Sequence, residues 1–208
     1  MSATGPIDEG YTKYEVDWRP APALPAEAVR ELNDCRNRLH EAGLVGHYEE
    51  HGVGYGNVSI RGPEPGTFII SGTQTGHIPR TDANHFALVT RCDIDANRVT
   101  CEGPIQASSE ALTHAAIYAL DPSIRAIAHV HSGELWHQLK DRVATTAPEV
   151  PYGTPEMARE FHRLYEDTDF ARSGVAVMAG HEEGLVAFGA TIAEAAERLL
   201  NLAGTLHP

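Results

Sequence analysis

Cysteine is scarce in this chain and is not arranged as a disulfide or ligand set. Among 208 residues there are only 3 cysteines, Cys35, Cys92 and Cys101, an odd number with no C-x-x-C pair. Small secreted folds usually depend on paired cysteines, and thiolate zinc sites need closely spaced ones. We therefore set aside both classes and expect a reducing, cytoplasmic environment.

Long hydrophobic runs and positive charge are also in short supply. No stretch approaches the roughly 18–20 apolar residues of a membrane-spanning helix, and residues 1–11 lack the basic and then apolar pattern of a signal peptide. Lys and Arg total 16 against 29 Asp and Glu, giving a net charge of −13, which disfavours contact with a phosphate backbone. We expect neither a membrane nor a nucleic acid as partner.

The apolar content that is present suffices for a folded domain. Hydrophobic residues make up 42% of the chain and charged residues 22%, within the usual range of globular proteins. Residues 1–23 are rich in proline, glycine and charge without a steady period. They are predicted to be an N-terminal arm on the surface or across a neighbouring subunit, and residues 24–208 a single domain.

Helical and strand-like segments are interleaved. Periodicity and turn signals predict helices over residues 25–43, 108–120, 134–140, 155–165 and 192–202, and strands over 58–60, 67–71, 86–92, 98–102, 125–131, 174–179 and 185–188. Short turns join some strands and helices join others. This favours an α/β fold whose mixed or mostly antiparallel sheet carries packed helices.

Histidine is enriched, with 12 residues, and two of them form an H-x-H pair at a predicted strand end. Residues i and i+2 of a strand point to the same face about 6–7 Å apart, so His129 and His131 could bind one metal ion. His181 follows another predicted strand and could supply a third ligand, as in catalytic zinc sites. The alternative is two hydrogen-bonded or solvent-facing strand histidines and an ordinary turn residue.

Glu110 begins a predicted helix directly after two serines. An acidic residue in a first helical turn complements the helix dipole and often completes a cap, which is one explanation for it. A carboxylate beside a metal-bound carbonyl compound would also suit proton transfer to and from carbon or oxygen. His114 lies one turn later, where we expect a structural hydrogen bond.

Small polar residues recur in three loops. They are Gly56-Asn57-Val58-Ser59, Thr73-Gln74-Thr75-Gly76 and Ser108-Ser109. Their hydroxyls, amide and backbone N–H groups could form an anion cradle without Lys or Arg, although each loop is also explained as an ordinary turn or cap. The glycines at 52, 54 and 56 neither follow a clear strand nor open a helix, so a dinucleotide site is rejected.

Taken in order, these motifs resemble the class II aldolase/adducin family over roughly residues 28–203. They are Gly-Asn-x-Ser at 56–59, the loop 70–79, Ala-Ser-Ser-Glu at 107–110, His-x-His-Ser at 129–132, and His181 followed by the segment 184–189. The resemblance implies a three-layer α/β/α sandwich with a central, mostly antiparallel sheet. It also implies a homotetramer with active sites at subunit boundaries.

By matching motifs, the resemblance assigns one divalent metal ion per subunit to His129, His131 and His181. Zinc is expected, with manganese, cobalt, nickel or iron as alternatives. It makes Glu110 the catalytic carboxylate, and it places substrate phosphate on Asn57, Thr75, Gly76, Ser108 and Ser109. The implied activity is that of a metal-dependent lyase (aldolase), which cleaves or forms a C–C bond in a small sugar phosphate or related hydroxy-carbonyl compound through a metal-stabilised enediolate.

Three features depart from the family pattern. Residues 132–151 contain no tyrosine to act as proton donor, Glu182 and Glu183 separate His181 from Gly184, and the loop 71–78 contains extra residues. The alternatives are an epimerase, decarboxylase or dehydratase on the same metal site, a non-catalytic adducin-like assembly module, or a metal-dependent binding protein for small acids.

Overall fold

A computed structural model of the chain describes residues 11–205. The first ten residues of the predicted arm therefore lie outside the described part. The secondary-structure elements in chain order are β1 (Glu15–Pro20), α1 (Ala26–Glu41), β2 (Gly46–Tyr48), β3 (Val53–Tyr55), β4 (Asn57–Arg61), β5 (Phe68–Ser71), the 3-10 turn η1 (Ala83–His85), β6 (Phe86–Asp93), β7 (Arg98–Gly103), α2 (Ala111–Leu120), β8 (Ala126–His131), α3 (Gly133–Leu139), β9 (Ala144–Thr145), α4 (Pro155–Asp167), α5 (Phe170–Ser173), β10 (Val175–Val177), β11 (Gly184–Gly189) and α6 (Ile192–Gly204).

Nine strands form one sheet in the order β1-β7-β6-β5-β4-β8-β11-β10-β9. Only the two outermost pairs, β1 with β7 and β9 with β10, are parallel. The other neighbouring pairs are antiparallel. The expected mostly antiparallel sheet is therefore confirmed.

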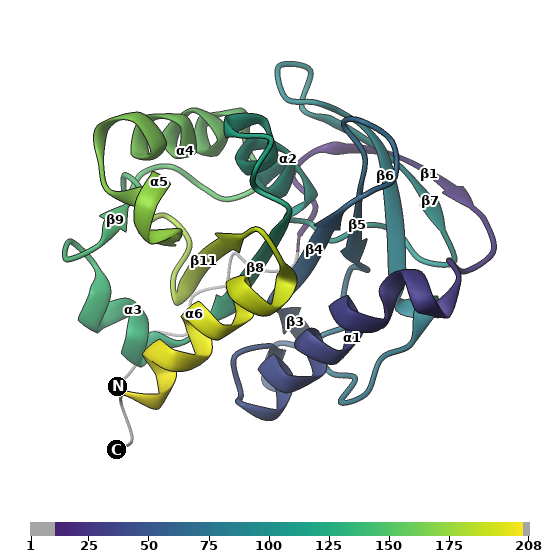
Figure 1. Cartoon of the computed structure of the whole chain (residues 1–208), viewed down its shortest axis with the longest axis horizontal. Coiled ribbons are helices and arrows are strands. Elements are labelled where there is room, and N and C mark those ends of the chain that lie inside the picture. Colours follow the sequence, from purple (N-terminus) through teal and green to yellow (C-terminus); the bar gives the residue numbers. More distant parts are fainter. Residues whose placement is uncertain (1–10, 206–208) are drawn as a thin grey trace.

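Helices cover both faces of this sheet (Figure 1). Helices α2 and α4 pack over one face, and α1 and α6 over the other, so the sheet is the middle of three layers. Alternate residues of a strand enter opposite cores: on β8, Ile127 belongs to the core with Leu112 of α2, and Ala128 to the core with Leu199 of α6. The three-layer α/β/α architecture is thus the one expected.

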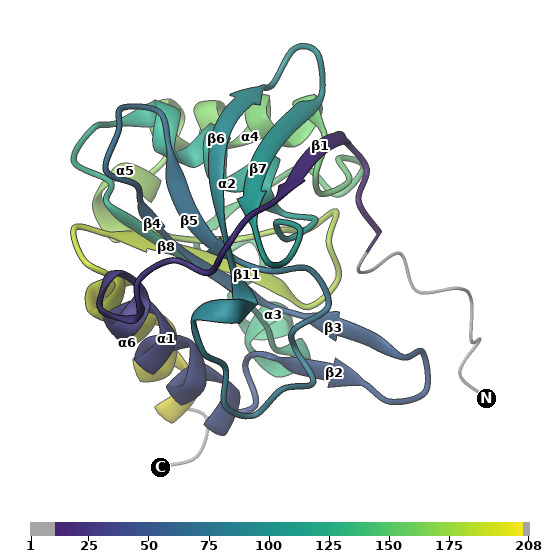
Figure 2. The same ribbon diagram turned by 90° about the vertical axis from the view of Figure 1, so that its right-hand side faces the viewer.

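The N-terminal arm contributes an unpredicted strand. Residues 15–20 form β1, which pairs with β7 at one edge of the sheet (Figure 2). Val16 and Trp18 alternate with charged residues here, but the segment is short, mostly exposed and set in a proline- and charge-rich arm, so its pattern does not predict a strand. The described part of the arm therefore packs on the sheet of its own chain.

A second unpredicted feature is a small hairpin. Strands β2 and β3 pair antiparallel, separate from the large sheet, and project beside it (Figure 2). Each strand has three residues, which is too short for a periodic pattern to be recognised. Gly52, with φ of +65°, marks the turn between them. The glycine run that was rejected as a dinucleotide motif thus belongs partly to this hairpin.

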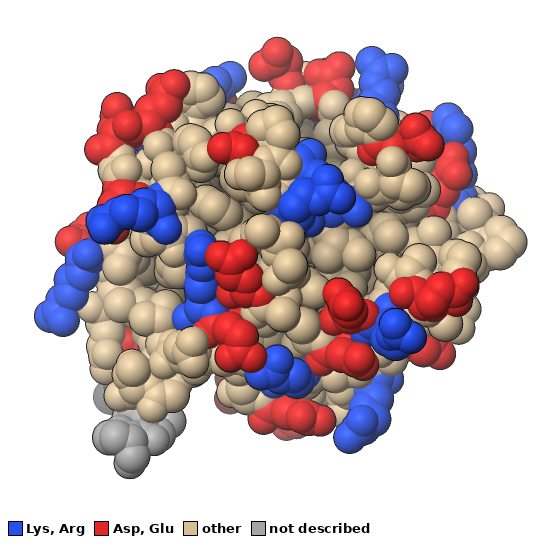
Figure 3. All heavy atoms as spheres, in the orientation of Figure 1, with Lys and Arg blue, Asp and Glu red and all other residues tan. Residues whose placement is uncertain are grey.

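The described surface carries charges of both signs. On the face in Figure 3, acidic and basic side chains of the described residues are interspersed and do not form one continuous basic patch. No helix within residues 11–205 combines the length and apolar character that crossing a bilayer requires.

Candidate active site

Strand alternation directs two histidines to the same side of the sheet. His129 and His131 share the parity of Ile127 on β8, and Ile127 packs in the core beneath α2. β8 is a central strand, paired with β4 on one side and β11 on the other, so both imidazoles are buried at its end.

His181 joins them from the loop between β10 and β11. One nitrogen from each of the three rings lies within 4.8 Å of the others, and all three residues are buried. The rings of His129 and His181 stack with centroids 5.0 Å apart. Gly184 permits this approach, because a Cβ there would lie 3.2 Å from both His129 Cε1 and His181 Cγ.

Burial keeps the paired rings neutral. Loss of solvent lowers the pKa of His129 and of His131 well below the usual value, and the repulsion that two protonated neighbouring imidazoles would experience lowers it further. Neutral imidazole is the form that binds metal ions, so the electrostatic setting suits ligation rather than an ion pair.

The donor geometry fits a metal ion. Nδ1 of His129 lies 3.0 Å from the carbonyl oxygen of Leu185, which can only accept, so the proton is on Nδ1 and Nε2 carries the lone pair. That Nε2 lies 3.1 Å from Nε2 of His131. Two ligands on a tetrahedral zinc at about 2.0–2.1 Å would be separated by about 3.3 Å. The structure therefore brings together the histidine triad that the sequence predicted.

Glu110 lies at the edge of this triad. It occupies the N-cap position of α2, where its side chain makes no capping hydrogen bond, and it is 1% exposed. Its Oε1 lies 3.3 Å from Nδ1 of His181. The side chain is thus directed toward the histidines and does not complete a cap. His114 has the structural role expected, with Nδ1 2.7 Å from Oγ of Ser59.

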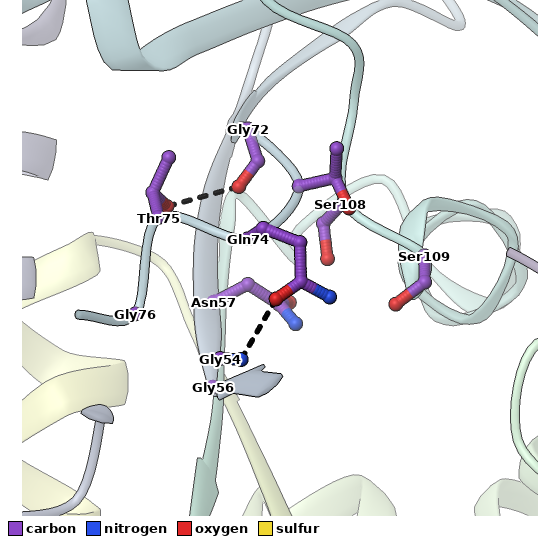
Figure 4. Close-up of a pocket in the computed structure, with 10 residues that line it drawn as sticks. Gly54, Gly56, Asn57, Gly72, Gln74, Thr75, Gly76, Ser108 and Ser109 are labelled. Atoms are coloured by element: carbon purple, nitrogen blue, oxygen red, sulfur yellow. Dashed lines mark hydrogen bonds between the residues drawn. The ribbon is translucent and has the colours of Figure 1, made fainter. Parts of the chain in front are cut away.

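A small polar pocket (Figure 4) adjoins the triad through Asn57, which pairs with His129 in the β4–β8 register. Its lining includes all five predicted phosphate-binding residues and contains no charged side chain. The ten lining residues are Gly54, Gly56, Asn57, Gly72, Thr73, Gln74, Thr75, Gly76, Ser108 and Ser109. Gln74 reaches into it and accepts a hydrogen bond of 2.8 Å from the backbone N–H of Gly54. Oδ1 of Asn57 is buried and has no hydrogen-bond partner in the described structure.

A buried arginine anchors one wall of the pocket. Arg36 of α1, 1% exposed, donates to the carbonyl oxygens of Thr75 at 2.7 Å and Gly76 at 3.3 Å. Burial lowers its pKa to about 10, which leaves it charged near neutral pH. The predicted first helix had no assigned role in the site, because a helical period does not reveal what a buried cation contacts.

Three tyrosines near the triad were not anticipated. Tyr152, one residue beyond the segment that lacks tyrosine, stacks on His181 with ring centroids 4.3 Å apart. Tyr48 and Tyr55, from the unpredicted hairpin, contact His131: the Tyr48 hydroxyl is 3.0 Å from Nδ1, and the Tyr55 ring stacks at 5.3 Å. The glycines of the hairpin were the only sequence signal for this contribution.

The N-terminal arm also reaches the site. Backbone atoms of Tyr11 hydrogen-bond the hydroxyl of Tyr152, and Nζ of Lys13 lies 3.8 Å from the centre of the same ring. Tyr14 donates to the carbonyl oxygen of Ser108 at 2.7 Å. Residues 11–14 therefore cover the outer side of the ring that stacks on His181.

Comparison with known proteins places this geometry in a family. Residues 31–207 match the model of the class II aldolase and adducin N-terminal domain. A search of curated protein sequences gave no significant match. Among solved structures, a sugar-phosphate aldolase from Thermotoga maritima is 20% identical, with a TM-score of 0.65 over 86% of this chain and 91% of that one.

Two other solved structures are similar. An L-fuculose 1-phosphate aldolase is 19% identical, with a TM-score of 0.63 over 88% of this chain and 86% of its own. YgbL from Klebsiella pneumoniae is 20% identical, with a TM-score of 0.64 over 88% of each chain. At this identity the likeness concerns the fold, and the family assignment comes from the sequence match over most of the chain. The chain belongs to the class II aldolase and adducin family.

Proposed function

We propose that the protein is a metal-dependent lyase that cleaves or forms a carbon–carbon bond in a small sugar phosphate or related hydroxy-carbonyl compound. The observation that carries this proposal is the convergence of three buried imidazoles beside the buried carboxylate of Glu110. An adducin-like assembly module would have no use for such a costly buried polar cluster.

His129, His131 and His181 would hold the divalent ion, with zinc expected and manganese, cobalt, nickel or iron as alternatives. When bound, the ion supplies a Lewis acid that polarises the substrate carbonyl and stabilises the negative charge left by bond cleavage. Glu110 would return a proton to the carbon that loses its partner, or remove a proton there in the synthetic direction.

The pocket beside the triad would hold the anionic end of the substrate. Asn57, Thr75, Gly76, Ser108 and Ser109 line it and offer amide, hydroxyl and backbone N–H groups. Such groups bind phosphate without a cationic side chain. Fixing that end of the substrate sets which carbon lies next to Glu110.

Metal analysis together with a product screen tests the activity. We expect one divalent ion per wild-type chain, and its loss in His129→Ala. Glu110→Gln should retain the ion and lose turnover by about 10²- to 10⁴-fold, as removal of a general acid–base does. Glu50→Gln, at an exposed position, is the matched control and should retain both.

The products decide between the lyase and its alternatives. Ketose phosphates and short aldehydes should give C–C cleavage or condensation products. An epimer as the sole product, or carbon dioxide or water loss, would instead indicate an epimerase, decarboxylase or dehydratase. YgbL, one of the similar structures, is described with aldolase, epimerase and decarboxylase as alternatives. A wild-type protein without stoichiometric metal would overturn the lyase.

We further propose a homotetramer, as the resemblance to the family implies, and a cytoplasmic location, as the few unpaired cysteines favour. Light scattering of the purified full chain measures the assembly: a mass of four chains is expected, and a monomer at all concentrations would contradict it.

A further inference from the structure

Glu183 has a backbone conformation that turns it toward the histidines. It is half-buried with a φ of +64°, a left-handed conformation that is uncommon outside glycine. Its carbonyl oxygen accepts a 2.9 Å hydrogen bond from the N–H of Ser132, the residue after His131. The backbone of Glu183 is thereby tied to the end of the strand that carries the histidine pair.

The carboxylate of Glu183 is hydrogen-bonded to the hydroxyl of Tyr48. The Tyr48 hydroxyl donates to Oε2 of Glu183 at 2.6 Å, and the same oxygen of Tyr48 lies 3.0 Å from Nδ1 of His131. Three residues from three separate elements, the hairpin, β8 and the loop before β11, thus form one chain of hydrogen bonds.

Proton counting fixes the direction of this chain. A tyrosine hydroxyl has one proton, and a carboxylate oxygen accepts, so the proton of Tyr48 is used by Glu183. The contact between Tyr48 and His131 must then be donated by Nδ1–H of His131. A neutral ring protonated at Nδ1 has its lone pair at Nε2, the atom that lies 3.1 Å from Nε2 of His129.

We propose that Tyr48 and Glu183 are positioning residues that hold His131 in the Nδ1-protonated tautomer, so that its Nε2 stays available to the metal ion. This inference rests on the metal-binding role proposed above. Groups that hydrogen-bond the distal nitrogen of a ligating histidine fix its tautomer and orientation, and their loss commonly weakens metal binding by about 10- to 100-fold.

A purely structural role for Tyr48 needs a separate control. Tyr48 and Tyr55 face each other on the hairpin with ring centroids 4.6 Å apart, and both rings contact His131. The hydroxyl of Tyr55, however, is 3.5 Å from the carbonyl oxygen of Gly43 and takes no part in the chain of hydrogen bonds. Tyr55→Phe therefore removes a hairpin hydroxyl while leaving the contact to Nδ1 intact.

The tautomer can be observed directly. In long-range ¹H–¹⁵N spectra of the metal-free full chain, His131 should show a protonated Nδ1 in wild type and in Tyr55→Phe. In Tyr48→Phe the ring loses its acceptor, and we expect a mixture of the two tautomers. A His131 that remains wholly Nδ1-protonated in Tyr48→Phe, or one that is Nε2-protonated in metal-free wild type, would overturn the inference.

Zinc affinity, measured by competition with a chromophoric chelator, gives the second readout. Tyr48→Phe should bind zinc about 10- to 100-fold more weakly than wild type. Glu183→Ala should also weaken binding, and Glu183→Gln should retain more affinity because an amide oxygen can still accept from Tyr48. Tyr55→Phe and Glu182→Gln, the latter at an exposed neighbour, should match wild type.

The outcomes separate the two proposals. Equal zinc affinity in wild type and Tyr48→Phe overturns the positioning role and leaves the lyase intact. Equal losses in Tyr48→Phe and Tyr55→Phe also overturn it, because hairpin packing would then explain both. A wild-type chain that binds no zinc or other divalent ion overturns the metal role itself, and the inference with it.

Discussion

Asn57 on β4 lies directly opposite His129 on β8 in the antiparallel register. The side chain of Asn57 lines the polar pocket, and the side chain of His129 belongs to the histidine triad. One strand pairing therefore joins the two halves of the site, and it places the pocket one side chain away from the triad. A substrate held in the pocket at one end could reach the triad with the other.

Asn57→Asp should discriminate between phosphorylated and uncharged substrates. Oδ1 of Asn57 is buried without a partner, and a carboxylate there would repel an anion in a pocket that has no charged lining residue. The loss of a hydrogen bond to a charged group is worth about 1.5–3 kcal/mol, so KM for a phosphorylated substrate should rise by roughly 10- to 100-fold. Steady-state kinetics on a phosphorylated substrate and its unphosphorylated analogue would measure this; equal effects on both would contradict a phosphate-binding pocket.

Gly76→Ala should displace one wall of the pocket. A Cβ at this position would lie 1.9 Å from the carbonyl oxygen of Gly46 and 2.9 Å from Cα of Gly54, both backbone atoms of the hairpin. Overpacking of this kind costs about 1–3 kcal/mol, and the free energy of unfolding should fall by that amount while KM rises. Urea unfolding gives the stability. Gly204→Ala, where a Cβ meets nothing within 4 Å, is the control and should cause no loss.

Arg36→Met should loosen the loop that Arg36 holds. The variant keeps the apolar stem of the side chain but leaves the carbonyl oxygens of Thr75 and Gly76 without their buried donor. An unsatisfied buried acceptor costs about 1–3 kcal/mol, so stability should fall and KM for a phosphorylated substrate should rise more than kcat falls.

The matched control for Arg36 is on the same helix. Arg38 forms a surface ion pair with Glu197 at 2.6 Å and is about half exposed. Exposed pairs contribute about 0–1 kcal/mol, so Arg38→Met should change stability little and KM not at all. Similar kinetic effects of the two variants would indicate that Arg36 acts through the general stability of α1.

His114 should make the fold sensitive to acid. Complete burial lowers the pKa of His114 to about 3, whereas the unfolded chain protonates this residue near pH 6.5. Between these values the unfolded state binds more protons, so the stability contribution is fully present above about pH 6.5. As the pH falls toward 3, it is lost at about 1.4 kcal/mol per pH unit. Urea unfolding of wild type and His114→Gln, from near pH 8 down to near pH 5, would measure the difference.

The variant should be less stable at neutral pH, because Ser59 loses one of its two hydrogen-bond partners, but its stability should fall less steeply below pH 6.5. Parallel stability curves for the two proteins would show that His114 is not protonated on unfolding in this range. The contributions of His129 and His131 remain in both proteins and cancel in the comparison.

The local sequence patterns were sufficient for much of the scaffold. The spacing of Val29, Leu32 and Leu39 predicted α1, and the turn signals around residues 93–97 predicted the β6–β7 hairpin. The H-x-H pair at 129–131 predicted two side chains on one strand face, because alternation along a strand is a local property. The order of the motifs then indicated the family, and with it the triad and the pocket residues.

Only the tertiary structure decided which distant groups surround these residues. Tyr48, Tyr152 and Glu183 reach the triad from a short hairpin and two loops, whose positions follow from strand pairing and packing across the whole chain. A three-residue strand is too short to show a periodic pattern in the sequence. A buried cation such as Arg36 cannot be distinguished in the sequence from an exposed helical arginine. The sequence by itself predicted the three histidines and the carboxylate that the structure brings together. The fold determined the hydrogen bonds around them, because those connect residues up to 135 positions apart.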